Sequence, residues 1–197
     1  MGEAGEKQTL KRYLQRQRDA LMWKVEGLSE RQVRWPVTPT GTNLLGLVKH
    51  VAGIEYGYFG EVFGRPAEDP MLADIDSLSD NDDFWARADE SLDDVVAFYG
   101  RAWVHADATI DALSLADTGT VPWWPEARRH PSLHTVLVHH IQELARHAGH
   151  ADIIRELTDG RVGVGPTLSN MAEFDSSSWA DYRAKLQGIA ESFPERG

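Results

Sequence analysis

The chain of 197 residues contains no cysteine. This absence excludes disulfide bonds, thiolate metal ligands and a cysteine nucleophile within the protein. If the protein carries out thiol chemistry, the thiol must therefore come from another molecule. Basic side chains are also scarce, because 20 lysines and arginines stand against 31 aspartates and glutamates, for a formal charge of −11. A surface of this charge argues against nucleic acid and anionic membranes as partners.

Long apolar runs are missing as well. No stretch of about 18 consecutive apolar residues occurs, so we expect no membrane span. The N-terminal sequence MGEAGEKQTLKRY lacks the apolar core of a signal peptide, which makes the cytoplasm the expected compartment. A hydrophobic content of 42% and a charged content of 26% are typical of a globular protein. The length fits one domain over residues 1–197.

Segments rich in strand-forming residues are too short to build a sheet, whereas apolar residues recur with helical spacing. We predict long helices over residues 7–27, 44–64, 91–113 and 132–157, and a final helix over 178–192. Short helical turns are expected at residues 29–32 and around Phe84 and Trp85. Residues 65–83 are rich in proline and acidic side chains and are expected to form a solvated loop. The fold class is therefore all-α, a four-helix bundle with additional short helices and a C-terminal helix.

The segment 132–157 holds five of the eight histidines and has a plausible N-cap in Ser132. One helical face carries an apolar stripe of Leu133, Val136, Leu137, His140, Leu144, Ala148, Ala151 and Ile154. Beside it lies a second line of His139, Glu143, His147 and His150, at spacings of four, four and three. Imidazoles around a carboxylate on a half-buried face need a positive group nearby, and a divalent metal ion would supply it.

Metal sites in helical bundles form from inward side chains on facing helices. His50 falls between Leu47 and Ile54 and so points inward or to the edge of the core, and it is a candidate ligand together with His139, Glu143, His147 and His150. Glu143 and His147 lie one turn apart and can chelate one ion together, with His50 as the third ligand from another helix. This set suits zinc, nickel or iron(II) better than magnesium or calcium. Three protein ligands leave a position open, as in catalytic sites, whereas a fourth protein ligand such as His139 or His150 would indicate a structural site. The alternative is that His50 is a core histidine bonded only to protein groups.

The other candidate residues are given more ordinary roles. We expect His150 to pack near the site without binding the metal and His139 to lie toward its mouth or the surface. His105 falls off the apolar stripe of its helix and is expected at the surface. Trp123 and Trp124 stand between prolines, where they form either a clasp over the core or one wall of a pocket, and we favour the clasp.

Two segments carry a resemblance to a known group. TNLLGLVKHVAGIEYGYFGEVFG and, far downstream, HTVLVHHIQELARHAGHADIIREL are similar to the DinB-like superfamily of four-helix metalloproteins, over roughly residues 7–190. The chain most resembles an uncharacterised actinobacterial branch, related to the mycothiol-dependent maleylpyruvate isomerases. In those isomerases a histidine of the second helix and a glutamate and a histidine four apart on the fourth hold zinc. The matching positions here are His50, Glu143 and His147.

The resemblance implies a metal-dependent transferase or isomerase that uses a low-molecular-weight thiol such as mycothiol as co-substrate, with a small molecule as the other substrate. A metal-bound thiol loses its proton and becomes a nucleophile, or the metal activates water instead. No signature of a maleylpyruvate pocket is present, so isomerase activity itself is not carried over. The rival function is a non-catalytic metal- or small-ligand-binding protein of a stress response. The oligomeric state stays open, with a homodimer as one option.

Overall fold

A computed structural model describes residues 2–75, 81–173 and 175–195, and over these residues the chain is all-α, without a named β-strand. The α-helices are α1 (Glu3–Trp23), α2 (Glu30–Arg34), α3 (Leu44–Phe59), α4 (Pro70–Ile75), α5 (Leu92–Ala112), α6 (Leu133–Asp159) and α7 (Ser176–Glu191). Three 3₁₀ turns lie between them, η1 (Glu61–Phe63), η2 (Asp82–Phe84) and η3 (Glu126–Arg128). The predicted fold class is confirmed. No helix among the described residues combines the length and apolar composition that crossing a bilayer requires.

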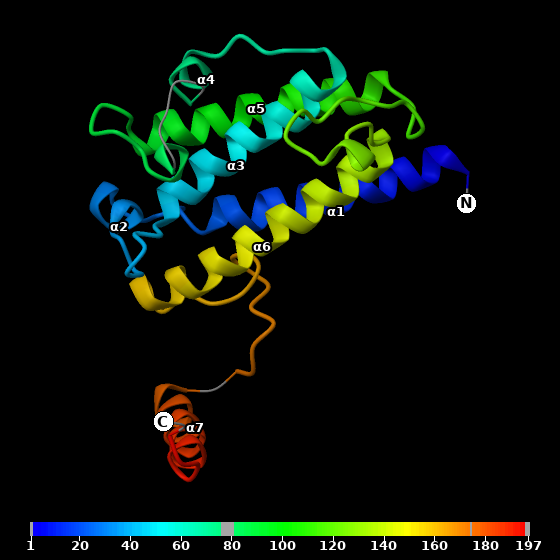
Figure 1. Ribbon diagram of the computed structural model, residues 1–197. Coiled ribbons are helices and arrows are strands. Elements are labelled where there is room, and N and C mark those ends of the chain that lie inside the picture. The colour runs from blue at the N-terminus through cyan, green and yellow to red at the C-terminus, as the bar shows by residue number, and fades with distance from the viewer. Residues whose placement is uncertain (1, 76–80, 174, 196–197) are drawn as a thin grey trace.

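The four long helices α1, α3, α5 and α6 form the bundle. Helix α3 packs along α5, α1 packs along α6, and α3 also contacts α6, so that α3 lies at the centre (Figure 1). Burial follows this position, because most residues of α3 are buried while α1, α5 and α6 bury only one face. Every member of the apolar stripe predicted on α6 is buried.

Side-chain caps set where these helices begin. Asn43 accepts a hydrogen bond from the amide of Gly46 and starts α3, and Ser132 accepts one from Thr135 and starts α6. Ser29 and Ser91 form capping boxes at the starts of α2 and α5. Helix α6 stops at Gly160, whose φ of 79° is in the left-handed region that glycine adopts without strain.

The acidic segment differs from its prediction as a loop. Residues 70–75 form α4, although residues 76–80 of the predicted loop lie outside the described residues. The second predicted helix, 44–64, is interrupted at Gly60 and continues as the 3₁₀ turn η1. Around Phe84 the expected short helix is the 3₁₀ turn η2, which ends before Trp85.

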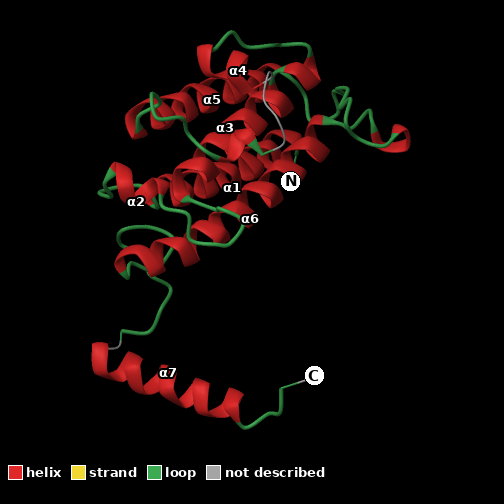
Figure 2. Ribbon diagram, turned by 60° about the vertical axis from the view of Figure 1, so that its left-hand side comes forward, coloured by secondary structure: helices red, strands yellow, loops and turns green. Residues whose placement is uncertain are grey.

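Helix α7 lies apart from the bundle, beyond an extended connection that follows α6 (Figures 1 and 2). None of its residues is buried, and its apolar side chains include Tyr182, Leu186 and Ile189, each about half exposed. The helix itself was predicted from its periodicity. A single domain over residues 1–197 stays a prediction.

A polar cluster sits inside the core and joins three helices. Glu55 on α3 accepts a hydrogen bond from Arg18 on α1, and His140 Nε2 on α6 lies 3.3 Å from the other oxygen of the same carboxylate. All three side chains are at most 1% exposed. His140 was predicted within the apolar stripe, and Glu55 explains how an imidazole is accommodated there.

Candidate metal centre and adjoining cavity

The three predicted ligands meet where α3 faces α6. One ligand atom from each of His50, Glu143 and His147 lies within 4.8 Å of the others. Nε2 of His147 is 3.0 Å from Oε1 of Glu143, one turn earlier on α6. The rings of His50 and His147 are 4.8 Å apart between centroids and nearly perpendicular. His50 and His147 are buried and Glu143 is half-buried, so the cluster is open to solvent mainly through its carboxylate.

His50 is held from its other side by η2. Its Nδ1 lies 2.5 Å from Oδ2 of Asp83, and its ring stacks on Phe84 with centroids 3.7 Å apart. An ionised carboxylate can only accept, so the neutral imidazole donates its hydrogen from Nδ1. That tautomer leaves the lone pair on Nε2. A histidine that binds a metal commonly donates its second N–H to a carboxylate in this way.

Both imidazoles are kept uncharged by their surroundings. Burial lowers the pKa of His50 below its ordinary value of 6.5, more strongly than the contact with Asp83 raises it. Burial, and then the nearby His50, lower the pKa of His147. Among the described residues, Nδ1 of His147 is buried and has no hydrogen-bond partner. Two neutral imidazoles and a carboxylate are ligands suited to a divalent metal of the zinc, iron(II) or nickel type. The Nδ1 atom of His147, which has no partner among the described residues, is a buried polar atom that also calls for one.

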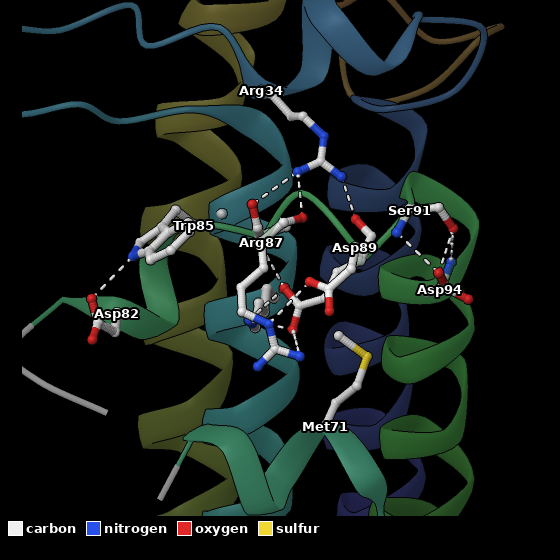
Figure 3. A network of polar contacts seen from close by, with 12 residues as sticks. Arg34, Met71, Asp82, Trp85, Arg87, Asp89, Ser91 and Asp94 are labelled. Atoms are coloured by element: carbon white, nitrogen blue, oxygen red, sulfur yellow. Dashed lines mark hydrogen bonds and ion pairs between the residues drawn. The ribbon is translucent and has the colours of Figure 1, made fainter. Parts of the chain in front are cut away.

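The segment that carries Asp83 and Phe84 is fixed against the bundle by polar contacts. Figure 3 shows Arg34 of α2 reaching this segment, where its guanidinium donates to the carbonyl oxygens of Ala86, Arg87 and Glu90. The Glu90 carboxylate in turn takes two hydrogen bonds of 2.8 Å from Lys49, the residue next to His50. Both members of that ion pair are buried.

Gly46 allows this segment to lie directly on α3. A Cβ added at Gly46 would stand 1.7 Å from the carbonyl oxygen of Phe84, which no side chain can tolerate. Gly46 is one helical turn before His50. The missing side chain therefore lets the backbone at Phe84 approach the helix and places Asp83 beside the imidazole.

A cavity of about 550 Å³ adjoins the cluster, and Glu143 and Asp83 line it. Its remaining walls come from α3, η1, α4 and the connection before α6, and its aromatic lining consists of Tyr56, Tyr58, Trp123, Trp124 and His139. Both tryptophans line the cavity and Trp124 also packs on the core, so this pair combines the two roles predicted for it, a pocket wall and a clasp over the core.

The hydroxyl group of Tyr58 contacts three other aromatic residues of the cavity lining. The indole N–H groups of Trp123 and Trp124 lie 3.4 Å and 3.2 Å from its oxygen, and Nε2 of His139 lies 2.9 Å from it. An indole nitrogen only donates, so the tyrosine oxygen accepts from both rings and its own hydrogen goes to His139. Burial lowers the pKa of His139, in keeping with a neutral acceptor.

The other histidines lie outside the cluster. The exposed ring of His150 packs 5.6 Å from the ring of His147 without joining the three ligand atoms. His139 is half-buried on the cavity wall. The prediction of a surface position for His105 needs correction, since this residue is half-buried against Tyr56 and its Nε2 contacts the carbonyl oxygen of Arg65.

Asp83 and Tyr58 were not identified from the sequence as parts of the site. Asp83 belongs to an acidic stretch that reads as solvated surface, and no spacing relates it to His50, 33 residues earlier. An i, i+8 relation between His50 and Tyr58 was the available signal, because it places both on one side of α3.

Comparisons with known proteins agree with this geometry. A family model described as mycothiol-S-transferase matches residues 9–160, which include most of α1, all of α3, α5 and α6, and all three candidate ligands. No curated protein matches the chain. The matched family is part of the DinB-like superfamily, whose bundle and ligand spacing the sequence resembles. The match covers well over half of the 197 residues, and the chain therefore belongs to the mycothiol-S-transferase family.

Proposed function

We propose that the protein is a metal-dependent S-transferase that joins mycothiol to a small electrophilic molecule. The observation that carries this proposal is the convergence of His50, Glu143 and His147 to within 4.8 Å at the wall of a cavity of about 550 Å³. Membership of the family supports mycothiol as the thiol, and the lack of cysteine in the chain fits a thiol that comes from another molecule.

The chain's own residues would hold and orient the reactants. His50 and His147 offer uncharged nitrogen ligands, and Glu143 offers an anionic oxygen at the edge of the cavity. A divalent ion held by these three residues would lower the pKa of a bound thiol and so supply a thiolate near neutral pH. Trp123, Trp124 and Tyr58 supply apolar surface for the second substrate and exclude water from one side of it.

Zinc is the metal we propose, with nickel or iron(II) as alternatives, because the ligand set suits all three. The open ligand position favours catalysis over the non-catalytic alternative, since neither His139 nor His150 belongs to the group of close ligand atoms. The cytoplasmic location, the absence of a nucleic-acid partner, a homodimer and the actinobacterial branch stay predictions.

Two variants of Glu143 test the proposal. The carboxylate reduces the charge of a bound divalent ion from +2 to +1. We expect Glu143→His to keep metal and fold while changing mycothiol affinity and turnover, because a more positive ion holds a thiolate more tightly. We expect Glu143→Ala to lose metal and, through linkage, thermal stability.

Metal content, melting temperature and the rate of mycothiol conjugation to an alkyl halide would be measured for both variants and for wild type. Matching values in all three measurements for Glu143→Ala would show that Glu143 is only a half-exposed helix residue. The proposal would then lose its main support.

A further inference from the structure

The cavity beside the cluster has a one-sided distribution of charge. Glu61, Asp83 and Glu143 all line it, whereas no lysine or arginine is among the described lining residues. A divalent ion held at the cluster would balance the charges of Asp83 and Glu143, so that Glu61 leaves the lining with a net negative charge when the metal is bound. The described residues 65–72 and 81–83, of which Ala67, Leu72 and Asp83 line the cavity, contain four acidic side chains and a single arginine, Arg65. A recess walled by one sign of charge concentrates ligands of the opposite sign and repels those of the same sign.

In the described part of the chain, lysine and arginine side chains near the cavity do not line it. Arg101 donates to both carboxylate oxygens of Asp69, at 2.6 Å and 3.2 Å. Lys49 is buried in its pair with Glu90. Arg128 lines a second depression, which shares Trp124 and His139 with the cavity. None of the three is among the described residues that line the cavity.

The aromatic side chains that line the cavity also favour a cationic ligand over an anionic one. Trp123 is 54% exposed, and its ring meets the ring of Tyr58 edge-on at 5.6 Å between centroids. Because both indole N–H groups and the tyrosine hydroxyl are used within the wall, these rings offer mainly their faces to a ligand. The face of an indole carries negative potential and attracts a cation or a flat apolar group.

Resting on the proposed transferase function, we propose that this cavity selects an uncharged or cationic second substrate with a flat apolar body, and that Glu61 at its rim helps to exclude carboxylates and other anions. In the transfer, the thiol sulfur forms a bond to the electrophilic carbon of this substrate. The bond from that carbon to its leaving group breaks, the leaving group departs with the electron pair, and the thiol proton passes to solvent.

Binding is tested first, with unreactive probes of one shape and three charges. These are toluene-4-sulfonate, 4-methylacetophenone and (4-methylphenyl)trimethylammonium, titrated into the metal-loaded full chain at about 0.15 M salt, where distant surface charge is screened. Calorimetry or tryptophan fluorescence gives the affinities. We expect the cation to bind about tenfold more tightly than the sulfonate, with the neutral ketone between them.

Matched variants locate the effect. Glu61→Gln should reduce the preference for the cation about threefold, whereas Glu68→Gln, the same charge change at an exposed site that does not line the cavity, should leave it unchanged. Equal affinities for the three probes, or tighter binding of the sulfonate, would overturn the proposal. So would a preference that Glu61→Gln does not alter.

Turnover separates this inference from the proposed function. The bromomethyl forms of the same three compounds would be offered with mycothiol, and release of bromide would be measured. We expect the protein to accelerate the conjugation of mycothiol to the cationic and neutral compounds. If the unreactive cation binds preferentially but no compound is conjugated faster than without protein, the transferase function fails and the charge preference stands.

Discussion

At the scale of single residues, Asp83 decides how well His50 can serve as a ligand. Its carboxylate fixes the imidazole with Nδ1 protonated and Nε2 available, and Phe84 fixes the plane of the ring. A carboxylate in this position also raises the basicity of the imidazole. Removing its charge should therefore weaken metal binding although the ligand itself is unchanged.

We predict that Asp83→Asn lowers metal affinity roughly 10–100-fold while the fold is kept. Affinity would be measured by competition with a chelator of known affinity, and fold by circular dichroism. Asp82→Asn is the matched control, because this neighbour loses the same charge but contacts Trp85 rather than His50. Equal affinity in Asp83→Asn and wild type would show that Asp83 does not position the imidazole.

At the scale of elements, the site depends on a contact between a loop segment and the first turn of α3. The helices themselves follow from local signals, namely the 3.6-residue apolar periodicity and the caps Asn43, Ser91 and Ser132. For that reason the bundle and its three inward-facing candidate ligands could be predicted. The approach of Phe84 to Gly46 is set by tertiary contacts of Arg34 and Lys49. These contacts join residues far apart in the chain and follow no regular sequence spacing, so they could not be predicted.

Gly46→Ala should displace η2 because the new methyl group would overlap the carbonyl of Phe84. We expect a destabilisation of about 1–3 kcal/mol from overpacking and a clear loss of metal affinity. The variant Gly100→Ala, on α5 with nothing within 4 Å of the added atom, serves as control. Thermal unfolding and metal titration of both proteins check the prediction, which fails if Gly46→Ala behaves like the control.

Helix α7 illustrates the same limit. Its periodicity predicts a helix, and the structure has one, with Asp175 as its N-cap. Where an amphipathic helix packs is decided by surfaces distant in sequence, and the apolar face of α7 remains exposed here. The family match, which ends at residue 160, likewise stops before this helix.

At the scale of the whole molecule, the buried cluster of Arg18, Glu55 and His140 links stability to pH. Burial alone would raise the pKa of Glu55, but the contacts with His140 and Arg18 outweigh it and hold the pKa below its ordinary value of 4.5. A carboxyl group with a lowered pKa in the folded state contributes stability above the unfolded value. That contribution is lost as the pH falls through the folded value.

We therefore predict that the free energy of unfolding decreases as the pH is lowered below about 4.5, with Glu55 as one contributor. Glu55→Gln should lower the free energy of unfolding by roughly 3–5 kcal/mol at neutral pH, because it leaves Arg18 without its buried partner. It should also make the free energy of unfolding fall less steeply as the pH drops below about 4.5. Chemical unfolding between pH 3 and pH 7 would measure both effects. If the free energy of unfolding of Glu55→Gln falls with pH as steeply as that of wild type, other carboxylates cause the loss of stability in acid.

The central claim is that two helices of this bundle bring His50, Glu143 and His147 together to bind one divalent metal ion. Its most direct test is elemental analysis of the purified protein beside His50→Ala and His147→Ala. His134→Ala is the control, because His134 pairs with Glu6 away from the site. The account predicts stoichiometric zinc, nickel or iron in wild type and in the control, and only traces in the other two variants. Stoichiometric metal and an unchanged melting temperature in His50→Ala would contradict it.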